Sequence, residues 1–180
     1  MIPLITHTPR LLMLATSRAL LTAELHKPQY FSILLGAALP ADWPVEAHSR
    51  ETREEMLAQL TAGGRTAAGW HGWYALRNAE GAAPRTLVGT GGFLGPPDAA
   101  GTTGITFSVA ADWRGQGLGT ELVGGLVQQA ATTAMVRLLM AYPAADNLAA
   151  QRALLANGFA PTGPAADGLL PFARSVEPVA

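Results

Sequence analysis

Apolar residues recur along the chain with two different spacings, one typical of helices and one typical of strands. Over the first third, apolar side chains recur every three or four positions, which is typical of amphipathic helices. We expect helices over residues 16–25, 28–36 and 50–64, the last ended by two adjacent glycines. An apolar run at residues 11–15 precedes them and predicts a buried strand, because it is too short for a signal peptide or a membrane span.

The period falls to two in the middle of the chain, which favours strands. Alternation predicts strands over residues 70–76, 86–95 and 102–109, joined by short segments rich in glycine and proline. Connections of this length are typical of an antiparallel meander. In the first of these strands we place four residues on one face: Trp70, Gly72, Tyr74 and Leu76.

Helices and strands alternate in the last third. An apolar stripe predicts a helix over residues 117–132, followed by a strand within 135–142, a helix over 148–157 and a final strand over 169–174. A meander followed by this alternation predicts a mixed α/β sheet with helices packed against it. Because we find no internal repeat and no long linker, we expect residues 1–180 to form a single domain.

Composition narrows the classes of partner. A formal net charge of −1 provides no long-range attraction to nucleic acid or to an anionic membrane. The chain has no cysteine, which excludes disulfides and thiolate metal sites and is consistent with the cytoplasm. No pair of His, Asp or Glu has ligand-like spacing on one helix face, so we expect no metal site.

The stretch ADWRGQGLGTEL at residues 110–121 carries the clearest chemistry. Gly115, Gly117 and Gly119 remove side chains where a strand turns into a helix. Backbone amides and the positive end of the helix can then bind an anion, and Arg114 adds a charged fork for a phosphate. The alternative is a plain glycine-rich turn.

Two other phosphate-binding loops fit this stretch less well. The spacing is G-x-G-x-G rather than G-x-G-x-x-G, and no acidic residue follows about 20 positions later to bind a ribose. The Lys-Ser or Lys-Thr of a P-loop is missing as well. A nucleotide-binding domain that uses the same glycines is therefore the weaker alternative.

The segment from Arg114 to Gly119 resembles the R/Q-x-x-G-x-G/A signature of the GCN5-related N-acetyltransferases, the GNAT superfamily. A second family signature, an asparagine that opens a helix ending in Gly-Phe, is matched by Asn147, Gly158 and Phe159. The likeness implies the GNAT fold, with a mixed central sheet, an N-terminal antiparallel meander and helices on both faces.

The sequence of the predicted meander resembles one branch of this family. The segment GGFLGPPDAAGTTGITFSV resembles the branch that acetylates ribosomal-protein N-termini, often called RimJ/RimL-like. The resemblance covers residues 11–159 and is sharp only in the two signatures.

The resemblance implies acetyl-CoA as co-substrate. In this family the strand before the glycine loop binds the pantetheine arm through its backbone, which assigns Phe107 and Val109. The Val109 N–H is also the candidate to hold the thioester oxygen. The pyrophosphate is assigned to seven residues: Arg114, Gly115, Gln116, Gly117, Leu118, Gly119 and Thr120.

Asn147 has two candidate roles. The resemblance places it near the pantetheine or the thioester, and its position before a helix also fits a helix cap. The two roles are compatible.

The residues for proton transfer depart from the family pattern. The implied reaction is direct attack of a neutral primary amine on the thioester, which a general base assists. Alignment places Gly104 where many relatives carry a glutamate, and Leu154 where many carry a tyrosine. Ser108 is the candidate to relay a proton through water, with strand packing as its alternative role.

Several other residues are weaker candidates. Other possible proton-transfer groups are Tyr142, Asp98 and His71, each with a structural or solvated alternative. Three residues that could wall an acceptor pocket, but for which we expect core packing, are Trp43, Trp70 and Trp73. The charged run at residues 50–55 predicts a solvated helix face in which Arg50 pairs with Glu54.

We therefore predict an N-acetyltransferase that transfers an acetyl group from acetyl-CoA to a primary amine, either a protein N-terminus or a small amine. The alternative is a GNAT domain that binds acyl-CoA as a sensor or interaction module without turnover, which the substitutions at Gly104 and Leu154 favour. Both a monomer and a homodimer are compatible with a sheet that has free edges.

Overall fold

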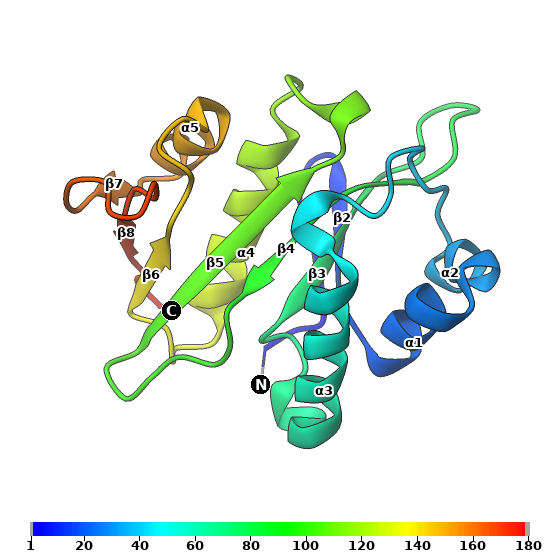
Figure 1. The fold of residues 1–180 in the computed structure, drawn as a ribbon, viewed down its shortest axis with the longest axis horizontal. Coiled ribbons are helices and arrows are strands. Elements are labelled where there is room, and N and C mark those ends of the chain that lie inside the picture. The colour runs from blue at the N-terminus through cyan, green and yellow to red at the C-terminus, as the bar shows by residue number, and fades with distance from the viewer. Residues whose placement is uncertain (1, 179–180) are drawn as a thin grey trace.

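The structure is a computed structural model that describes residues 2–178. Its strands are β1 (Ile5–His7), β2 (Leu11–Ala15), β3 (Gly72–Arg77), β4 (Thr86–Phe93), β5 (Thr102–Val109), β6 (Leu138–Ala141), β7 (Ala160–Pro161) and β8 (Phe172–Ser175). Its helices are α1 (Arg18–His26), α2 (Pro28–Leu35), α3 (Arg50–Ala67), α4 (Leu118–Thr132) and α5 (Leu148–Ala156), with 3₁₀ turns η1 (Glu46–His48) and η2 (Ala111–Trp113). Figure 1 shows their arrangement.

The strands form one mixed sheet in the order β1-β2-β3-β4-β5-β6-β8-β7. Strands β1 to β5 pair antiparallel with their neighbours, so the predicted meander is confirmed. Strand β5 pairs in parallel with β6, and α4 makes the connection between them. The mixed α/β sheet expected from the sequence is confirmed, with β1 and β7 as short strands that the pattern did not predict.

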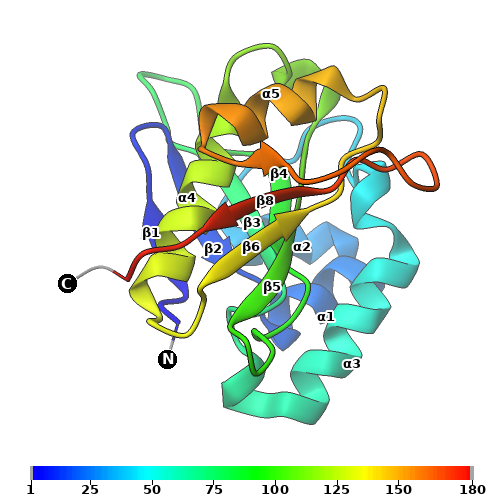
Figure 2. The same cartoon turned by 90° about the vertical axis from the view of Figure 1, so that its left-hand side faces the viewer.

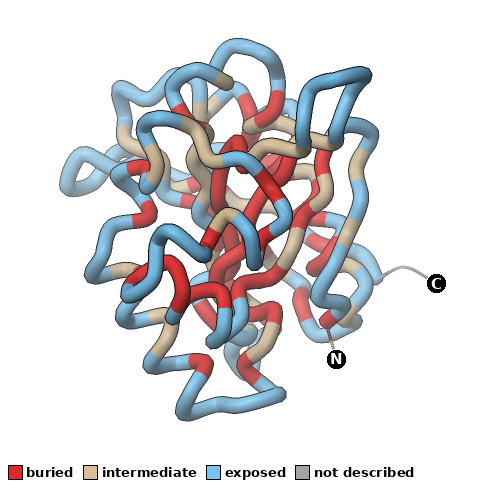
Figure 3. Tube along the Cα trace, turned by 90° about the vertical axis from the view of Figure 1, so that its right-hand side faces the viewer, coloured by how far each residue is buried: buried red, intermediate tan, exposed pale blue. Residues whose placement is uncertain are grey.

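Helices cover both faces of the sheet. Figure 2 shows α4 on one side of the strands and α1, α2 and α3 on the other. The larger apolar cluster joins α4 and α5 to the sheet, and a second joins α1 and α2 to the opposite face. Buried residues are concentrated in the central strands between these layers (Figure 3). Among residues 2–178, no helix is long and apolar enough to cross a bilayer.

Local sequence signals account for the helix ends. The Ser17 hydroxyl accepts a hydrogen bond from the Leu20 N–H at the start of α1. Gly36 ends α2 in the left-handed conformation with φ of 69°. The paired glycines do break α3 as predicted, because Gly64 has non-helical φ and ψ values of 55° and −132°; a further helical turn follows this kink and extends α3 to Ala67.

Two strand predictions need correction. Trp70 lies before β3, so the alternation does not reach it; its ring packs in the α4-side cluster, whereas Tyr74 and Leu76 lie in the cluster on the opposite face. The final strand begins at Phe172 rather than at residue 169. Pro171 has no N–H to donate to a ladder, and it precedes the first paired residue.

The central feature of the sheet is the divergence of β5 from β6. Their parallel pairing ends where Gly104 lies opposite Met140. Pairing of β5 with β4 on its other side continues to Val109. Figure 1 shows the two strands running apart beyond this point. The second half of β5 therefore has one edge that β6 does not cover.

Candidate active site

The uncovered edge of β5 presents backbone groups of alternate residues. The Ala110 N–H donates to the Val88 carbonyl, which fixes the even-numbered residues of β5 as those that bond to β4. The odd-numbered residues turn their N–H and C=O groups the other way, toward the gap left by β6. Phe107 and Val109 are odd-numbered, and they lie beyond the last β6 pair at Gly104. Their orientation matches the backbone role assigned to them from the sequence.

The glycine loop turns the chain from β5 into α4. Gly115 and Gly117 have φ values of 74° and 77°, the left-handed region that favours glycine. Helix α4 then begins at Leu118, and the N–H groups of its first turn have no partner within the helix. Since Gly117 is the N-cap residue, no side chain covers these amides. The loop therefore offers a row of backbone donors and a helix dipole to an anion.

A cleft of about 620 Å³ joins this loop to the edge of β5. Of the residues assigned to cofactor or catalysis from the sequence, the cleft is lined by Phe107, Ser108, Val109, Arg114, Gly115, Gly117, Leu118, Gly119, Thr120 and Asn147. Gln116 does not line it: its carbonyl accepts a hydrogen bond from Arg10 Nη1, and its side-chain amide donates to the Asp112 carbonyl.

Five further residues line the cleft that sequence reasoning missed: Trp113, Ala149, Ala150, Arg152 and Ala153. Arg152 of α5 donates a hydrogen bond from Nε to the Leu148 carbonyl at 3.2 Å. The Arg77 guanidinium lies over the Trp113 ring, 5.3 Å from its centroid. Arg152 lies five residues after Asn147, in the second signature, so its charge was a readable signal. Its guanidinium adds positive charge to the lip of the cleft.

Asn147 and Arg114 both hold the cleft wall in place. The Asn147 side-chain oxygen accepts from the Ala150 N–H at 3.0 Å, so it caps α5 while also lining the cleft. Arg114 Nε donates to the Val109 carbonyl at 2.9 Å. That bond occupies the Val109 carbonyl and leaves the Val109 N–H directed to the same gap.

An ion pair from the N-terminal hairpin supports the loop from behind. Arg10 Nε lies 2.7 Å from Glu121 Oε2, and the Arg10 N–H donates to Glu121 Oε1 at 2.6 Å. The Thr8 hydroxyl donates to the same carboxylate. Burial alone would raise the pKa of Glu121, but these hydrogen bonds and the Arg10 charge together lower it below its ordinary value. Glu121 therefore stays ionised and anchors Arg10 against the loop.

A comparison with protein-family models matches residues 20–160 to the acetyltransferase (GNAT) domain. This span is more than three quarters of the chain and contains both the β5 edge and the glycine loop. The chain belongs to the GNAT acetyltransferase family. A comparison with curated proteins gave no match.

Solved structures of acetyltransferases share the fold. RimL, a ribosomal L7/L12 alpha-N-protein acetyltransferase in complex with coenzyme A, is 18% identical over 98% of both chains with a TM-score of 0.65. The ribosomal-protein-S5-alanine acetyltransferase from Vibrio fischeri is 13% identical over 96% of this chain and 97% of its own, also with a TM-score of 0.65. The aminoglycoside acetyltransferase AAC(6')-Ib in complex with coenzyme A is 20% identical over 91% and 93%, with a TM-score of 0.58. These likenesses confirm the GNAT fold, which this chain shares with RimL and with other ribosomal-protein acetyltransferases.

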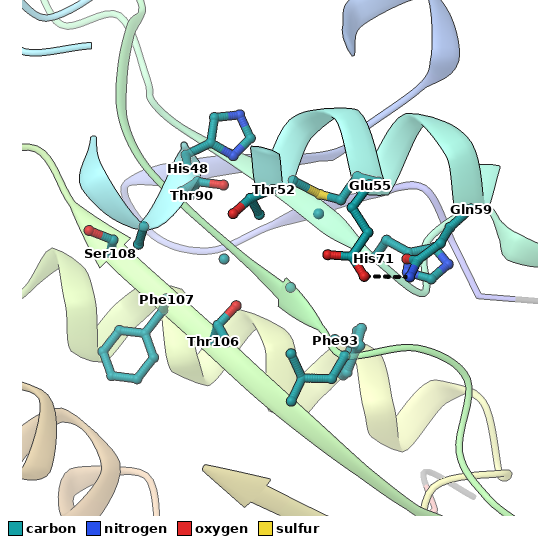
Figure 4. A pocket seen from close by; sticks show the side chains of 16 residues that line it. His48, Thr52, Glu55, Gln59, His71, Thr90, Phe93, Thr106, Phe107 and Ser108 are labelled. Atoms are coloured by element: carbon teal, nitrogen blue, oxygen red, sulfur yellow. Dashed lines mark hydrogen bonds between the residues drawn. The ribbon is translucent and has the colours of Figure 1, made fainter. Parts of the chain in front are cut away.

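The GNAT domain has a second cavity, of about 150 Å³, on the opposite face of β4 and β5. Figure 4 shows Thr52 and Glu55 of α3 across this cavity from Thr106 and Ser108 of β5, with His48 near the Ser108 end. Phe107 and Ser108 line both this cavity and the larger cleft. The two spaces therefore meet at the uncovered part of β5. We call the smaller space the acceptor-side cavity and the larger one the cofactor-side cleft.

The family's usual proton-transfer positions hold no polar group in this chain. Leu154 is fully buried in the larger apolar cluster. A Cβ built on Gly104 would lie 2.5 Å from the Leu94 Cδ1 atom, so the Leu94 side chain occupies the space that a side chain at 104 would need. The glutamate and the tyrosine of the family pattern are therefore absent from this chain, and Leu94 fills the space beside position 104.

The other sequence candidates fall in different places. Ser108 lines both spaces, and His71 lines the acceptor-side cavity. Tyr142 is exposed and lines neither space. The Asp98 carboxylate accepts from the Ala100 and Thr102 N–H groups, which confirms the turn role.

The three tryptophans pack rather than wall the acceptor-side cavity. Trp73 is fully buried, and its indole N–H donates to the Gly69 carbonyl at 2.9 Å. Trp70 packs on Phe93, with ring centroids 5.5 Å apart. Trp43 donates its indole N–H to Glu24 at 2.7 Å. The core-packing prediction is confirmed for Trp70 and Trp73, and Trp43 has a polar partner that the sequence did not indicate.

The charged run on α3 is a solvated face only in part. Arg50 and Glu54 form the predicted exposed pair, with Nε and Oε1 2.8 Å apart. Arg53 instead turns inward and is buried, with Nη1 3.5 Å from Glu24 Oε1. Glu55 lines the acceptor-side cavity. The prediction of a solvated face is therefore wrong for Arg53, because a buried carboxylate needs a cation beside it.

Glu24 forms a buried polar cluster next to this cavity. Tyr74 Oη donates to Glu24 Oε2 at 2.6 Å, and His48 Nε2 lies 3.1 Å from the same oxygen. Burial alone would raise the pKa of Glu24, but bonds from His48, Tyr74 and Trp43 lower it below its ordinary value. Burial and then the Glu24 charge raise the pKa of Tyr74 well above 10.0. Glu24 is therefore an anion at neutral pH, and Tyr74 a neutral donor.

Sequence reasoning missed this cluster, although one signal was available. Glu24 lies three and four positions after Leu21 and Leu20, on the apolar stripe of α1. A carboxylate on a buried stripe needs partners, and this one draws them from α3, β3 and the loop before η1.

Proposed function

We propose that this GNAT domain binds acetyl-CoA in the cofactor-side cleft and transfers the acetyl group to a primary amine in the acceptor-side cavity. The observation that carries the proposal is the meeting of the two spaces at Phe107 and Ser108, beside an uncovered strand edge. Bound acetyl-CoA supplies an activated acetyl group as a thioester. The protein supplies binding, orientation and proton transfer.

The residues present fit the proposed co-substrate. The pantetheine arm, with its two amides, suits an unpaired strand edge, and the Phe107 and Val109 backbone groups face it. The pyrophosphate suits the left-handed loop at Gly115 and Gly117 and the first turn of α4. Arg114 and Arg152 add positive charge at the same mouth. Gln116 is left out of the pyrophosphate contacts, except through its backbone.

The acceptor in this proposal is a primary amine that enters past α3. A volume of about 150 Å³ accommodates the amine-bearing end of a molecule and leaves the remainder outside. Glu55 is an acidic group at this cavity and favours a cationic ammonium. Both a protein N-terminus and a small amine present such an end, and the fold shared with RimL favours the N-terminus.

A second candidate function is acyl-CoA binding without turnover. The observation in its favour is the loss of both usual proton-transfer positions, with Leu94 filling the space beside Gly104 and Leu154 in the core. It requires the cofactor-side cleft alone. The cytoplasmic location, the single domain over 1–180 and the monomer or homodimer all stay predictions.

The first experiment is calorimetric titration of the protein with acetyl-CoA. Gly117→Trp should weaken binding by about 100-fold or more, because an indole fills the loop; this corresponds to about 2.8 kcal/mol. Gly81→Trp is the matched control, since Gly81 also has a positive φ of 58° but lies in an exposed turn away from the cleft. Unchanged affinity in Gly117→Trp, or no binding by folded wild type, would overturn the proposed site.

Turnover is then tested with an amine panel. Free-thiol release from acetyl-CoA is measured with tetrapeptides that begin with serine or alanine, with spermidine and with ethanolamine. Amine-dependent release above the rate with water supports transfer. Binding without release across the panel supports the second candidate function.

A further inference from the structure

His48 occupies an unusual position in this molecule. It ends the short turn η1, is 1% exposed, and yet lines the acceptor-side cavity. Its ring packs 5.2 Å from the Trp43 ring and 5.8 Å from the Tyr74 ring, measured between centroids. The imidazole is therefore held rigidly at the wall of the space where the proposed acceptor lies.

The partner of one ring nitrogen fixes the role of the other. Nε2 lies 3.1 Å from Glu24 Oε2. Glu24 is an anion that also accepts from Trp43 and Tyr74, so as a pure acceptor it requires a proton on Nε2. The neutral imidazole then carries no proton on Nδ1, which is left as a proton acceptor. A carboxylate that sets the tautomer of a histidine in this way makes the free nitrogen a base.

The sheet register connects His48 to the proposed reaction centre. Tyr74 lies directly opposite Thr90 on β4, and Thr90 lies opposite Ser108 on β5. Directly opposed residues share a face of the sheet, so these three side chains form a row that runs from the His48 ring to the edge of the cofactor-side cleft. Thr90, Ser108 and His48 all line the acceptor-side cavity, which spans this distance.

We propose that His48 is the general base for the acceptor amine and that Glu24 is its positioning residue. This rests on the proposed function. The acceptor ammonium gives one proton to His48 Nδ1 through water in the cavity. The neutral amine then forms the N–C bond to the acetyl carbon as the C–S bond breaks. The second amine proton goes to the departing thiolate, and His48 returns its proton to solvent.

Other charged groups around the cavity fit this role less well. His71 lies at the other end, where β4 and β5 present Phe93 and Ile105, before the uncovered part of β5. Burial lowers the pKa of His71, while Glu55 acts in the opposite direction. Arg53 and Tyr74 face the Glu24 carboxylate rather than the acceptor. His48 is thus the histidine aligned with Ser108.

The activity test compares two histidines of the same cavity. His48→Gln keeps an N–H donor for Glu24 but removes the base, so kcat/KM for the best amine of the panel should fall by about 10²–10⁴-fold while acetyl-CoA binding stays unchanged. His71→Gln should lower kcat/KM far less. Glu24→Gln should also lower kcat/KM, since it removes the anion that fixes the proton on Nε2. An unchanged kcat/KM in His48→Gln, or a comparable fall in His71→Gln, would overturn the proposal.

A second measurement does not depend on turnover. Nitrogen-15 NMR of the imidazole side chains should find His48 as the Nε2–H tautomer at neutral pH, with a bare Nδ1, and the signal should be absent in His48→Gln. An Nδ1–H tautomer would overturn the base assignment even if the domain transfers acetyl groups. Failure of wild type to bind acetyl-CoA is a separate result, which overturns the proposed function instead.

Discussion

The cofactor-side cleft and the acceptor-side cavity, which meet at β5, are lined by different kinds of chemical group. The cofactor-side cleft is made largely of backbone: a strand edge, a left-handed loop and the first turn of α4, drawn from one continuous segment. The acceptor-side cavity is lined largely by side chains that come from η1, α3, β4 and β5. Backbone amides are the same whatever side chain a position carries, whereas the side chains that line the cavity can change with the acceptor. The difference implies that binding and acceptor choice can be altered separately.

Stability is distributed unequally between the two sides as well. The acceptor side contains the buried Glu24 carboxylate, which is surrounded by a guanidinium, an indole N–H, an imidazole and a phenol. The cofactor side has a partly exposed ion pair between Arg10 and Glu121. Since exposed pairs contribute little and buried ones are costly to break, the acceptor side should be the more sensitive to single substitutions.

The largest expected effect comes from Arg53→Met. Removing this cation leaves Glu24 without a fixed positive charge, and we expect a loss of about 3 kcal/mol in the free energy of unfolding. Arg50→Met, three residues earlier on the same helix, removes only the exposed pair with Glu54 and should cost less than about 1 kcal/mol. Urea denaturation measures both. Equal losses in the two variants would contradict the contrast between buried and exposed pairs.

Arg10→Met tests whether Arg10 holds the glycine loop of the cofactor-side cleft in its binding shape. We expect acetyl-CoA binding to weaken by about tenfold, equivalent to about 1.4 kcal/mol, because the Gln116 carbonyl loses its donor and the loop loses its fixed shape. Titration calorimetry measures the affinity. The matched control is Arg18→Met, since Arg18 is an exposed residue in the first turn of α1, far along the sheet from the loop. Full affinity in Arg10→Met would show that the loop holds its shape unaided.

Two substitutions of Asn147 distinguish its role as a helix cap from a role in ligand contact. Asn147→Ala should cost about 1 kcal/mol of stability through loss of the α5 cap. Asn147→Ser keeps a capping oxygen and should restore that stability. If turnover stays low in Asn147→Ser while stability returns, the side chain contacts the substrates. If both return together, Asn147 acts only as a cap.

The smallest expected effect is on acid stability. Glu24 and Glu121 both have a pKa lowered on folding from the ordinary 4.5, so the unfolded chain binds these protons more readily. Stability is therefore complete above about pH 4.5 and is lost as the pH falls through the folded pKa values. Because Glu24 is the more deeply buried, Glu121→Gln should keep most of the slope in urea denaturation between pH 3 and 7. A flat profile in Glu121→Gln would place the slope on the cofactor side.

Most elements of the fold were predictable because they depend on local periodicity. Strand β5 has the predicted bounds, and α4 begins one residue after the predicted start. Most of the cofactor-side cleft was predictable for the same reason: its residues lie within two short segments, 107–120 and 147–153, each of which carries a sequence signature. Gln116 is the exception, because a donor 106 residues away orients its carbonyl.

The acceptor-side cavity was not predictable in this way. The polar cluster next to it forms only when α1, α3 and β3 pack together, and no short spacing in the sequence records that contact. His48 lies in a proline-containing loop that carries no periodic signal. The register that aligns Tyr74, Thr90 and Ser108 depends on two strand pairings, which alternation alone does not specify.

The bond from Arg10 to the Gln116 carbonyl has a consequence for the thermodynamics of ligand binding. A peptide unit is planar and trans, so a carbonyl held toward Arg10 directs the N–H of Gly117 the opposite way. Glycine in the unfolded chain has wide conformational freedom, and folding has already removed it before any ligand arrives. Binding of an anion at this loop should therefore carry little entropic penalty for loop ordering, and mobility introduced at Arg10 should appear as a less favourable binding entropy.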